Sequence, residues 1–224
     1  ITRPVHYEPA QGSHQLEGYI PPGEPGYPVD HAHRIQVPKD QYYVDMVSRF
    51  YPALFTPGLL VEQPGDDRPV IFVEYAHSMG NSTGNLKEFW DIFRATPRII
   101  GGCIWDYKDQ GLLKTDSCGT GYYAYGGDFG EKLHDSNFCL NGIVASDGRP
   151  KPAIYECKRV FQPVGCEYPG QGRIRISNRH AVKSLAGYDV MLTFRENGFE
   201  IATLKLPDMH VAAGADSVID ISAR

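Results

Sequence analysis

The sequence predicts an α/β fold over residues 1–164 and a small antiparallel β domain over residues 165–224. In the first part, short apolar segments that end in polar residues alternate with a helical pattern, which is typical of a parallel sheet with helical crossovers. In the second part, strict alternation at residues 173–177 and the dipeptide Asn197-Gly198 indicate antiparallel strands joined by a tight turn. Further strands of this part are expected at residues 188–195, 201–206 and 218–221.

Four segments of the first part have the composition of buried parallel strands, and they lie near residues 3–8, 44–51, 70–75 and 101–107. A complete (β/α)8 TIM barrel needs eight such strands and about 250 residues, so the pattern predicts half of a barrel. Residues 9–38 are rich in Gly and Pro and predict a long loop. Residues 59–67 are too short and too closely bounded by Pro and Gly for a full helix, which indicates one shortened barrel helix.

Apolar residues at helical spacing predict an amphipathic helix after the third strand segment. They are Leu86, Phe89, Trp90 and Phe93. Trp90 belongs to this apolar face, so we expect it in the core rather than under a ligand. Asn85 and Glu88 have the spacing of an N-terminal capping box. A second helix is expected at residues 152–160, whereas residues 112–144, rich in Gly, Tyr and Asp, are expected to be irregular.

The composition excludes several function classes. A net charge of −5 argues against binding of nucleic-acid phosphates, and no apolar run approaches the roughly 18 residues of a membrane span. Five cysteines without a Cys-x-x-Cys pair weaken a zinc or redox interpretation, so buried free thiols are expected. The chain begins without an initiator Met or a signal-peptide pattern, so we expect a piece of a longer polypeptide, whether cytoplasmic or periplasmic.

The most informative stretch is the apolar run at residues 70–73, which ends on the carboxylate of Glu74. Tyr75, His77 and Asn81 then place polar groups in the following residues. A carboxylate at the carboxyl end of a buried parallel strand is where α/β barrels carry their catalytic residues. The alternative is a glutamate that is solvated or satisfied by a local cap, because a likeness of fold alone does not establish function.

Four ordered motifs extend this observation. Glu-Tyr-Ala-His-Ser-Met-Gly-Asn begins at Glu74, Gly-Gly-Cys-Ile-Trp-Asp-Tyr at Gly101, Tyr-Gly-Gly-Asp-Phe-Gly at Tyr125 and Asn-Phe-Cys-Leu-Asn-Gly at Asn137. In this order they closely resemble segments of the β-galactosidases of glycoside hydrolase family 2. The resemblance implies that the half barrel holds strands 5–8 of the catalytic TIM barrel. It also implies that residues 165–224 are the truncated β-sandwich domain that follows the barrel.

The resemblance assigns the chemistry of a retaining glycosidase, which needs two carboxyl groups about 5–5.5 Å apart. It implies that Glu74 is the nucleophile and that Tyr51 contacts it as a hydrogen-bond donor. The acid/base residue of the family lies in an Asn-Glu segment that has no counterpart in this chain. We therefore expect the isolated chain to be inactive.

The resemblance also implies four sugar- or cation-binding residues. His77 would bind sugar hydroxyls, Trp105 would form the aromatic floor under galactose, and Asn141 would contact the substrate. Phe138 and Asn141 resemble a Na⁺ site, through a backbone carbonyl and an amide oxygen, and such oxygens suit a hard cation. The main Mg²⁺ ligands of the family have no counterpart in this chain. Structural roles in the core remain the alternatives for Tyr51, His77 and Trp105.

The sequence therefore predicts part of a retaining β-galactosidase that hydrolyses terminal, lactose-like β-D-galactosides by double displacement. One alternative is a structural or associating piece without activity of its own, because half a barrel leaves strand edges unpaired. The other is a relative that acts on β-glucuronides or β-mannosides. The expected partners are a β-galactoside, the rest of the parent polypeptide and further copies in a homo-oligomer, with no nucleic acid and no membrane.

Overall fold

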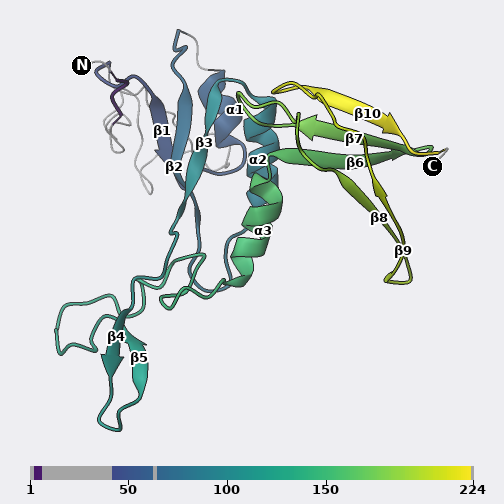
Figure 1. Ribbon diagram of the computed structural model, residues 1–224. Coiled ribbons are helices and arrows are strands. Elements are labelled where there is room, and N and C mark those ends of the chain that lie inside the picture. Colours follow the sequence, from purple (N-terminus) through teal and green to yellow (C-terminus); the bar gives the residue numbers. More distant parts are fainter. Residues whose placement is uncertain (1–2, 7–41, 63–64, 223–224) are drawn as a thin grey trace. The chain divides into compact units, whose positions relative to one another are not determined.

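A computed structural model describes residues 3–6, 42–62 and 65–222 (Figure 1). The chain divides into two compact units, Ile1–Val160 and Phe161–Arg224, each with a hydrophobic core of its own. The boundary expected from the sequence, after residue 164, falls at the first residue of a strand of the second unit. The long loop predicted at residues 9–38 lies outside the described residues. In the described part of the chain, no helix is long and apolar enough to cross a membrane.

The first unit contains a parallel sheet of three strands, β1 (Val47–Phe50), β2 (Val70–His77) and β3 (Ile99–Trp105). Their order is β1-β2-β3, and both pairings are parallel, as the apolar runs predicted. The described strands form an open sheet rather than a closed barrel.

The fourth predicted strand, near residues 3–8, is not formed in residues 3–6, and its remainder lies outside the described residues. Val5 still makes two hydrogen bonds with Asp45, one through its backbone carbonyl and one through its backbone amide. The Val5 carbonyl accepts from the Asp45 amide at 2.8 Å, and the Val5 amide donates to Asp45 Oδ2 at 2.6 Å. One of these two contacts is made by a side chain, so the pair does not build a backbone ladder.

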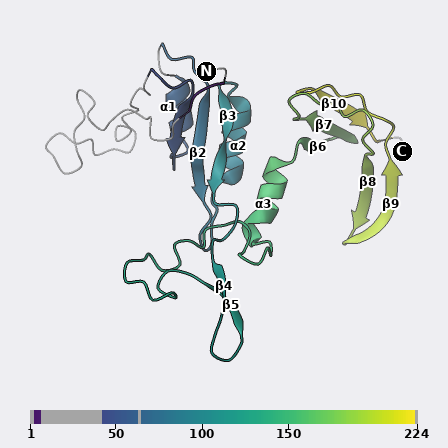
Figure 2. The same ribbon diagram turned by 60° about the vertical axis from the view of Figure 1, so that its left-hand side comes forward.

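Three helices contribute to one core on one face of this sheet (Figures 1 and 2). They are α1 (Thr56–Val61), α2 (Leu86–Ala95) and α3 (Pro152–Phe161). The shortened helix expected at residues 59–67 is α1, which begins earlier because Pro57 occupies its first turn, where a missing N–H costs nothing. The other two helices begin at or next to their expected first residues.

Helix α2 buries the apolar face that its spacing predicted. Phe93 stacks on Phe72 of β2 with ring centroids 5.3 Å apart and planes 1° from parallel. Trp90 packs against the same core, and its Nε1 donates to the Tyr75 hydroxyl at 3.0 Å. Burial raises the pKa of Tyr75 far above its usual value, so the hydroxyl stays protonated. The capping box was wrong: Asn85 adopts a left-handed conformation with φ 59°, and its side chain caps nothing.

A charge cluster ties the amino ends of the sheet together. Arg68 donates to Asp66 through Nε at 2.9 Å, Nη2 at 2.7 Å and its backbone amide at 3.1 Å. Arg98 lies 3.4 Å from the same carboxylate and also donates to the carbonyls of Leu60 and Val61, at the end of α1. The pKa of Asp66 is lowered, chiefly by the side-chain hydrogen bond from Arg68. The backbone hydrogen bond from Arg68 and the charges of Arg68 and Arg98 lower it further, whereas burial acts in the opposite direction.

The Asp66→Asn substitution is expected to lower the free energy of unfolding by about 1–3 kcal/mol at neutral pH. Because the pKa of Asp66 is lower in the folded than in the unfolded chain, its carboxylate stabilises the fold fully at pH values above the unfolded-state pKa of about 4. This contribution is lost as the pH falls through the folded-state pKa. Urea unfolding across this range should therefore show the wild type and the variant converging in acid. Asp91→Asn, which removes an exposed pair with Lys87, is the matched control with little expected effect. A difference that stays constant with pH would contradict the linkage.

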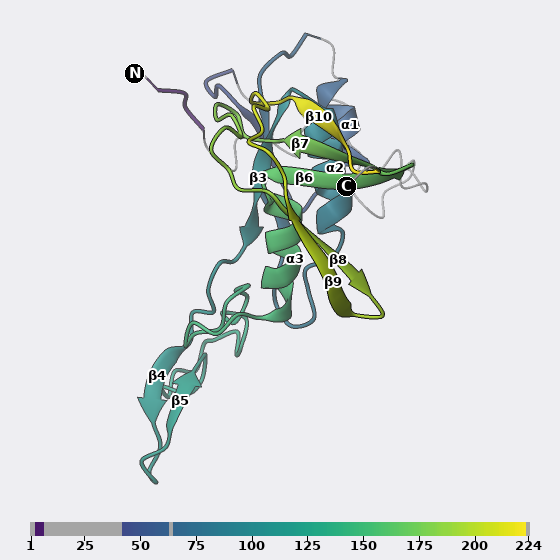
Figure 3. The same ribbon diagram turned by 45° about the vertical axis from the view of Figure 1, so that its right-hand side comes forward.

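The stretch after β3 was expected to be irregular, but it contains a two-stranded hairpin. Strands β4 (Leu112–Thr115) and β5 (Gly121–Ala124) pair antiparallel beyond the carboxyl end of β3 (Figure 3). Leu112 and Leu113 are largely exposed on it. The hairpin lacks the apolar/polar alternation of a half-buried strand, which is why the sequence pattern did not reveal it.

The second unit is antiparallel, as predicted. Strand β7 (Arg173–Asn178) pairs with β6 (Val164–Gly170) and β10 (Asp216–Asp220), and β8 (Met191–Glu196) pairs with β9 (Phe199–Lys205). The Asn197-Gly198 turn joins β8 to β9 with positive φ at both residues, as a type I′ hairpin requires. Strand β6 was missed because its sequence does not alternate and its pairing contains a register shift.

All five cysteines are free, as expected, but only one of them is buried. Cys157 packs in the core of the first unit, and burial raises the pKa of its thiol. Cys103, Cys118 and Cys166 are exposed and Cys139 is half-buried. The expectation of buried thiols was therefore wrong for most of them: Cys103 and Cys166 are exposed on strands, and Cys118 is exposed in the turn between β4 and β5.

Candidate active site

The carboxyl ends of the three parallel strands meet at one edge of the sheet. His77, the last residue of β2, is in register with Trp105, the last residue of β3. Glu74 is in register with the last residue of β1, and its carbonyl accepts a 2.5 Å hydrogen bond from the amide of Tyr51. Parallel pairing thus brings His77 and Trp105 together at the edge where α/β barrels hold their active sites. Glu74 was expected at the end of its strand, but β2 continues to His77, so Glu74 lies within the strand.

Three rings follow one another along this edge. Tyr51 and His77 have ring centroids 5.9 Å apart, and His77 stacks on Phe138 at 5.6 Å with planes 28° apart. The amide of Met79 donates to His77 Nδ1 at 3.4 Å. A neutral imidazole that accepts at Nδ1 carries its proton on Nε2, so His77 can donate a hydrogen bond from that atom.

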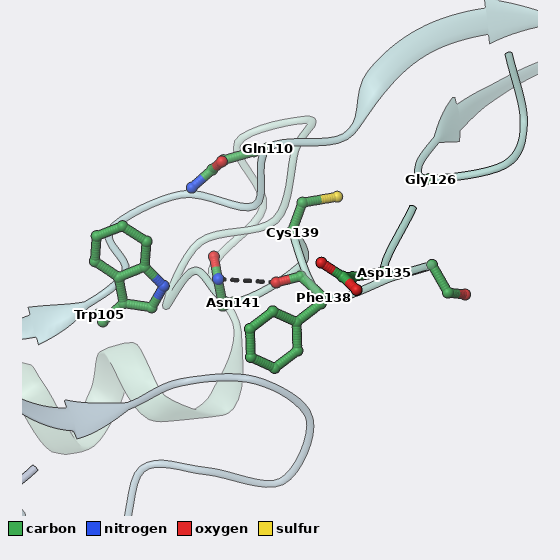
Figure 4. Close-up of a pocket in the computed structure, with 8 residues that line it drawn as sticks. Trp105, Gln110, Gly126, Asp135, Phe138, Cys139 and Asn141 are labelled. Carbon is green, nitrogen blue, oxygen red and sulfur yellow. Dashed lines mark hydrogen bonds between the residues drawn. The ribbon is translucent and has the colours of Figure 1, made fainter. Parts of the chain in front are cut away.

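A cavity of about 320 Å³ lies beside this edge (Figure 4). Its lining consists of Trp105, Gln110, Gly126, Asp135, Ser136, Phe138, Cys139 and Asn141. Trp105 contributes an indole and Phe138 a phenyl ring, and these two residues are 39% and 57% exposed. An open cavity with exposed aromatic faces and a few polar groups has the composition of a small-molecule site. Phe138 belongs both to this lining and to the row of rings.

Backbone hydrogen bonds hold the two loops that form the cavity against each other. The amide of Asp106 donates to the Asn141 carbonyl at 2.7 Å, and the amide of Gln110 donates to the Cys139 carbonyl at 2.9 Å. Near these hydrogen bonds the backbone at Gly142 passes directly against the backbone at Asp109. A Cβ added to Gly142 would lie 2.2 Å from the amide nitrogen of Asp109. Only glycine permits so close an approach of two backbones.

Asn141 is the most deeply buried polar residue of the cavity, with 3% of its surface exposed. Its Nδ2 donates to the Phe138 carbonyl at 3.0 Å, whereas its Oδ1 is buried without a hydrogen-bond partner among the described residues. A buried acceptor without a partner is costly, so it indicates a ligand that donates a hydrogen bond or a cation. Carbonyl and amide oxygens are ligands that suit a hard cation such as Na⁺.

The structure brings the predicted site residues together in two overlapping groups. Trp105, Phe138 and Asn141 line the cavity, and Tyr51 and His77 join it through the ring of Phe138. Glu74, Tyr51 and His77 lie outside the cavity lining itself. Glu74 is half-buried, and its link to the group runs through the backbone of Tyr51.

The site assignment from the sequence left out five residues of the lining. They are Gln110, Gly126, Asp135, Ser136 and Cys139. Cys139 stands inside the motif that begins at Asn137, and Gln110 follows soon after the motif that begins at Gly101. Their nearness to these motifs was the only signal available, because neither an amide nor a thiol stands out by residue type.

The charged residues of the described segments do not assemble a multi-ligand metal centre. No group of three or more His, Cys, Asp or Glu side chains that could hold a metal ion occurs in the described residues. A cation held by carbonyl and amide oxygens is a different kind of site, which does not depend on these side chains.

Comparison with known proteins places these features in a family. Residues 1–166 match the family model described as glycosyl hydrolases family 2, TIM barrel domain. The β-galactosidase of Priestia megaterium (strain DSM 319 / IMG 1521) is 45% identical over 133 residues, 58% of this chain and 13% of that protein. The β-galactosidases of Photobacterium profundum and Vibrio cholerae are 37% identical over 166 residues and 38% identical over 165 residues.

The last two alignments cover 72% and 73% of this chain, and each covers 16% of the relative. The chain therefore spans only a small part of the length of the curated relatives that it matches. The family model, in contrast, covers well over half of the chain. The chain belongs to glycosyl hydrolases family 2, and residues 1–166 are a region of its TIM barrel domain.

Proposed function

We propose that this chain is the nucleophile-bearing part of a retaining β-galactosidase. The observation that carries the proposal is the pairing of His77 with Trp105 at the carboxyl edge of the parallel sheet, beside a cavity that contains an amide oxygen without a partner among the described residues. Glu74 lies on the same strand as His77, three residues before the end of β2. The three relatives described above are β-galactosidases, and this supports a galactoside as the substrate.

In this proposal Glu74 attacks the anomeric carbon, the bond from that carbon to the leaving oxygen breaks, and a covalent glycosyl-enzyme forms. A second carboxyl group about 5–5.5 Å away protonates the leaving oxygen and then activates the water that releases the sugar. That second group comes from a segment with no counterpart in this chain. The isolated chain is therefore expected to bind sugar without turning it over.

The other predicted residues bind and orient the sugar. His77 donates from Nε2 to a sugar hydroxyl, because its Nδ1 already accepts from Met79. The indole face of Trp105 covers the C–H face of the ring, and the hydroxyl of Tyr51 donates to the nucleophile. Asn141 Oδ1 accepts from a hydroxyl or, together with the Phe138 carbonyl, would hold Na⁺. A bound Na⁺ would supply positive charge beside the sugar hydroxyls, and Mg²⁺ in the full-length polypeptide would take its ligands from outside this chain.

The proposal also assigns the architecture. Residues 1–164 are the second half of the barrel, strands 5–8, and residues 165–224 begin the β-sandwich that follows it. The open edge of β3 would then pair with one of the remaining barrel strands, since an unpaired edge presents free N–H and C=O groups.

A second candidate is a structural piece that associates with the rest of the polypeptide or with another copy and has no chemistry of its own. The open sheet and the exposed Leu112 and Leu113 of the β4–β5 hairpin favour it. A stable monomer of the isolated chain in sedimentation experiments would contradict this candidate.

A mechanism-based 2-deoxy-2-fluorogalactoside tests the proposed function on the full-length polypeptide that carries this chain. The inactivator should form a stable ester with Glu74, which peptide mass spectrometry locates. A panel of galactosides, glucuronides and mannosides then decides the sugar, with hydrolysis of the galactosides expected to be fastest. Labelling of a different carboxylate, or preference for another sugar, would overturn the assignment.

A further inference from the structure

Gln110 is a cavity residue whose role the proposed mechanism leaves open. It lies in the loop after β3, and its side chain lines the cavity together with Trp105 and Asn141 (Figure 4). Its backbone amide donates to the Cys139 carbonyl at 2.9 Å, so its position is tied to the opposite loop of the cavity. The main chain that carries Gln110 is therefore anchored where the two loops meet.

Asp106 determines how the Gln110 side chain is oriented. Gln110 Nε2 donates to Asp106 Oδ2 at 2.7 Å, and the other carboxylate oxygen accepts from the amide of Tyr107. The backbone of Asp106 is itself fixed, because its amide donates to the Asn141 carbonyl and its carbonyl accepts from Ile143 at 2.9 Å. An ionised carboxylate only accepts, so it selects the nitrogen end of the Gln110 amide and leaves Oε1 for another partner.

Asn141 shows the same arrangement on the same cavity. Its Nδ2 is engaged by the Phe138 carbonyl and its buried Oδ1 is without a hydrogen-bond partner among the described residues. The lining thus contains two amides that each commit a nitrogen to a neighbour, and the carboxylate of Asp135 as a further acceptor. A lining rich in acceptors suits a ligand rich in hydroxyl donors, which is the chemistry of a sugar.

We propose that Gln110 accepts a hydrogen bond from one hydroxyl of the galactosyl ring, and that Asp106 is the positioning residue that holds its amide in this orientation. The inference rests on the proposed function, because it adds to that site one more residue that hydrogen-bonds a sugar hydroxyl. A site that pairs with a substrate hydroxyl discriminates against an analogue that lacks it, since the protein acceptor is then left unpaired.

Aryl galactosides that each lack one hydroxyl, at C2, C3, C4 or C6, test the proposal in the full-length polypeptide. Gln110→Ala should lower kcat/KM for the parent galactoside by about 10- to 100-fold. For the one deoxy substrate that lacks the paired hydroxyl, the wild type and Gln110→Ala should have nearly equal kcat/KM. For each substrate, the ratio of the wild-type kcat/KM to the variant kcat/KM cancels the intrinsic reactivity of that substrate. The ratio therefore reports only the contact that Gln110 makes.

Two further variants separate binding from a general structural role. Asp106→Asn should show a smaller loss with the same hydroxyl signature, because an asparagine can offer its N–H to Gln110 and let that amide turn. Asn137 is an exposed residue of the neighbouring loop and does not line the cavity. Asn137→Ala should therefore leave kcat/KM unchanged for the parent galactoside and for every deoxy substrate. Equal losses on all four deoxy substrates and the parent would overturn the role of Gln110, whereas absence of turnover by the wild type would overturn the proposed function.

Discussion

Glu74→Gln in the full-length polypeptide is expected to lower kcat/KM for an aryl galactoside by at least about a thousandfold, because an amide cannot form the glycosyl ester. The exchange keeps the size of the side chain and its place beside Tyr51, so folding should be unaffected. Steady-state kinetics with nitrophenyl galactoside measures the loss. Glu88→Gln, which removes an exposed carboxylate in the first turn of α2, is the matched control and should retain activity.

Chemical rescue makes this prediction specific to a nucleophile. In Glu74→Gly, added azide should attack the anomeric carbon from the vacated side and displace a dinitrophenolate, which leaves without a proton. One inversion in place of two gives the α-galactosyl azide, which NMR distinguishes from the β product of a retaining reaction. Formation of the β-azide would indicate that Glu74 acts as the acid/base group and would refute its assignment.

Phe72→Ala is expected to lower the free energy of unfolding by about 3–5 kcal/mol, the largest stability change we predict. Phe72 is fully buried and its ring stacks on Phe93, so the truncation leaves a cavity between β2 and α2. With Trp105→Phe as the background, Trp90 is the only tryptophan of the chain and reports on this same core during urea unfolding.

Leu113→Ala is the control for this measurement. Leu113 is also a large apolar residue, but 70% of it is exposed on the β4–β5 hairpin, so its truncation should change stability by less than about 0.5 kcal/mol. Similar effects of the two substitutions would show that the core does not depend on the stacked rings.

Local patterns were sufficient for the main parallel strands and helices of the first unit, but not for its β4–β5 hairpin. The spacing of Leu86, Phe89 and Phe93 predicted α2, and the apolar run before Glu74 predicted β2, because each pattern reflects the period of one element against one buried face. Predictions failed where a residue conformation depends on its surroundings. Asn85 has a side chain suited to capping, yet the turn that enters α2 requires a positive φ there.

The candidate site divides in the same way. Motifs in the sequence named Trp105, Phe138 and Asn141 individually, and their resemblance to a known family suggested roles. The family itself was confirmed by comparison of residues 1–166. The roles of Glu74 and of the sugar- and cation-binding residues stay predictions until labelling and kinetics test them.

The sequence by itself determined the class of the two units, the main strands and helices, and the membership in family 2, because these depend on short periodic patterns and ordered motifs. Only the tertiary structure decided that Gln110 and Asn141 share a cavity and that each amide is oriented by a neighbour. The reason is physical: side-chain orientation depends on hydrogen bonds between Asp106, Phe138 and these amides, and such contacts join loops that the linear sequence keeps apart.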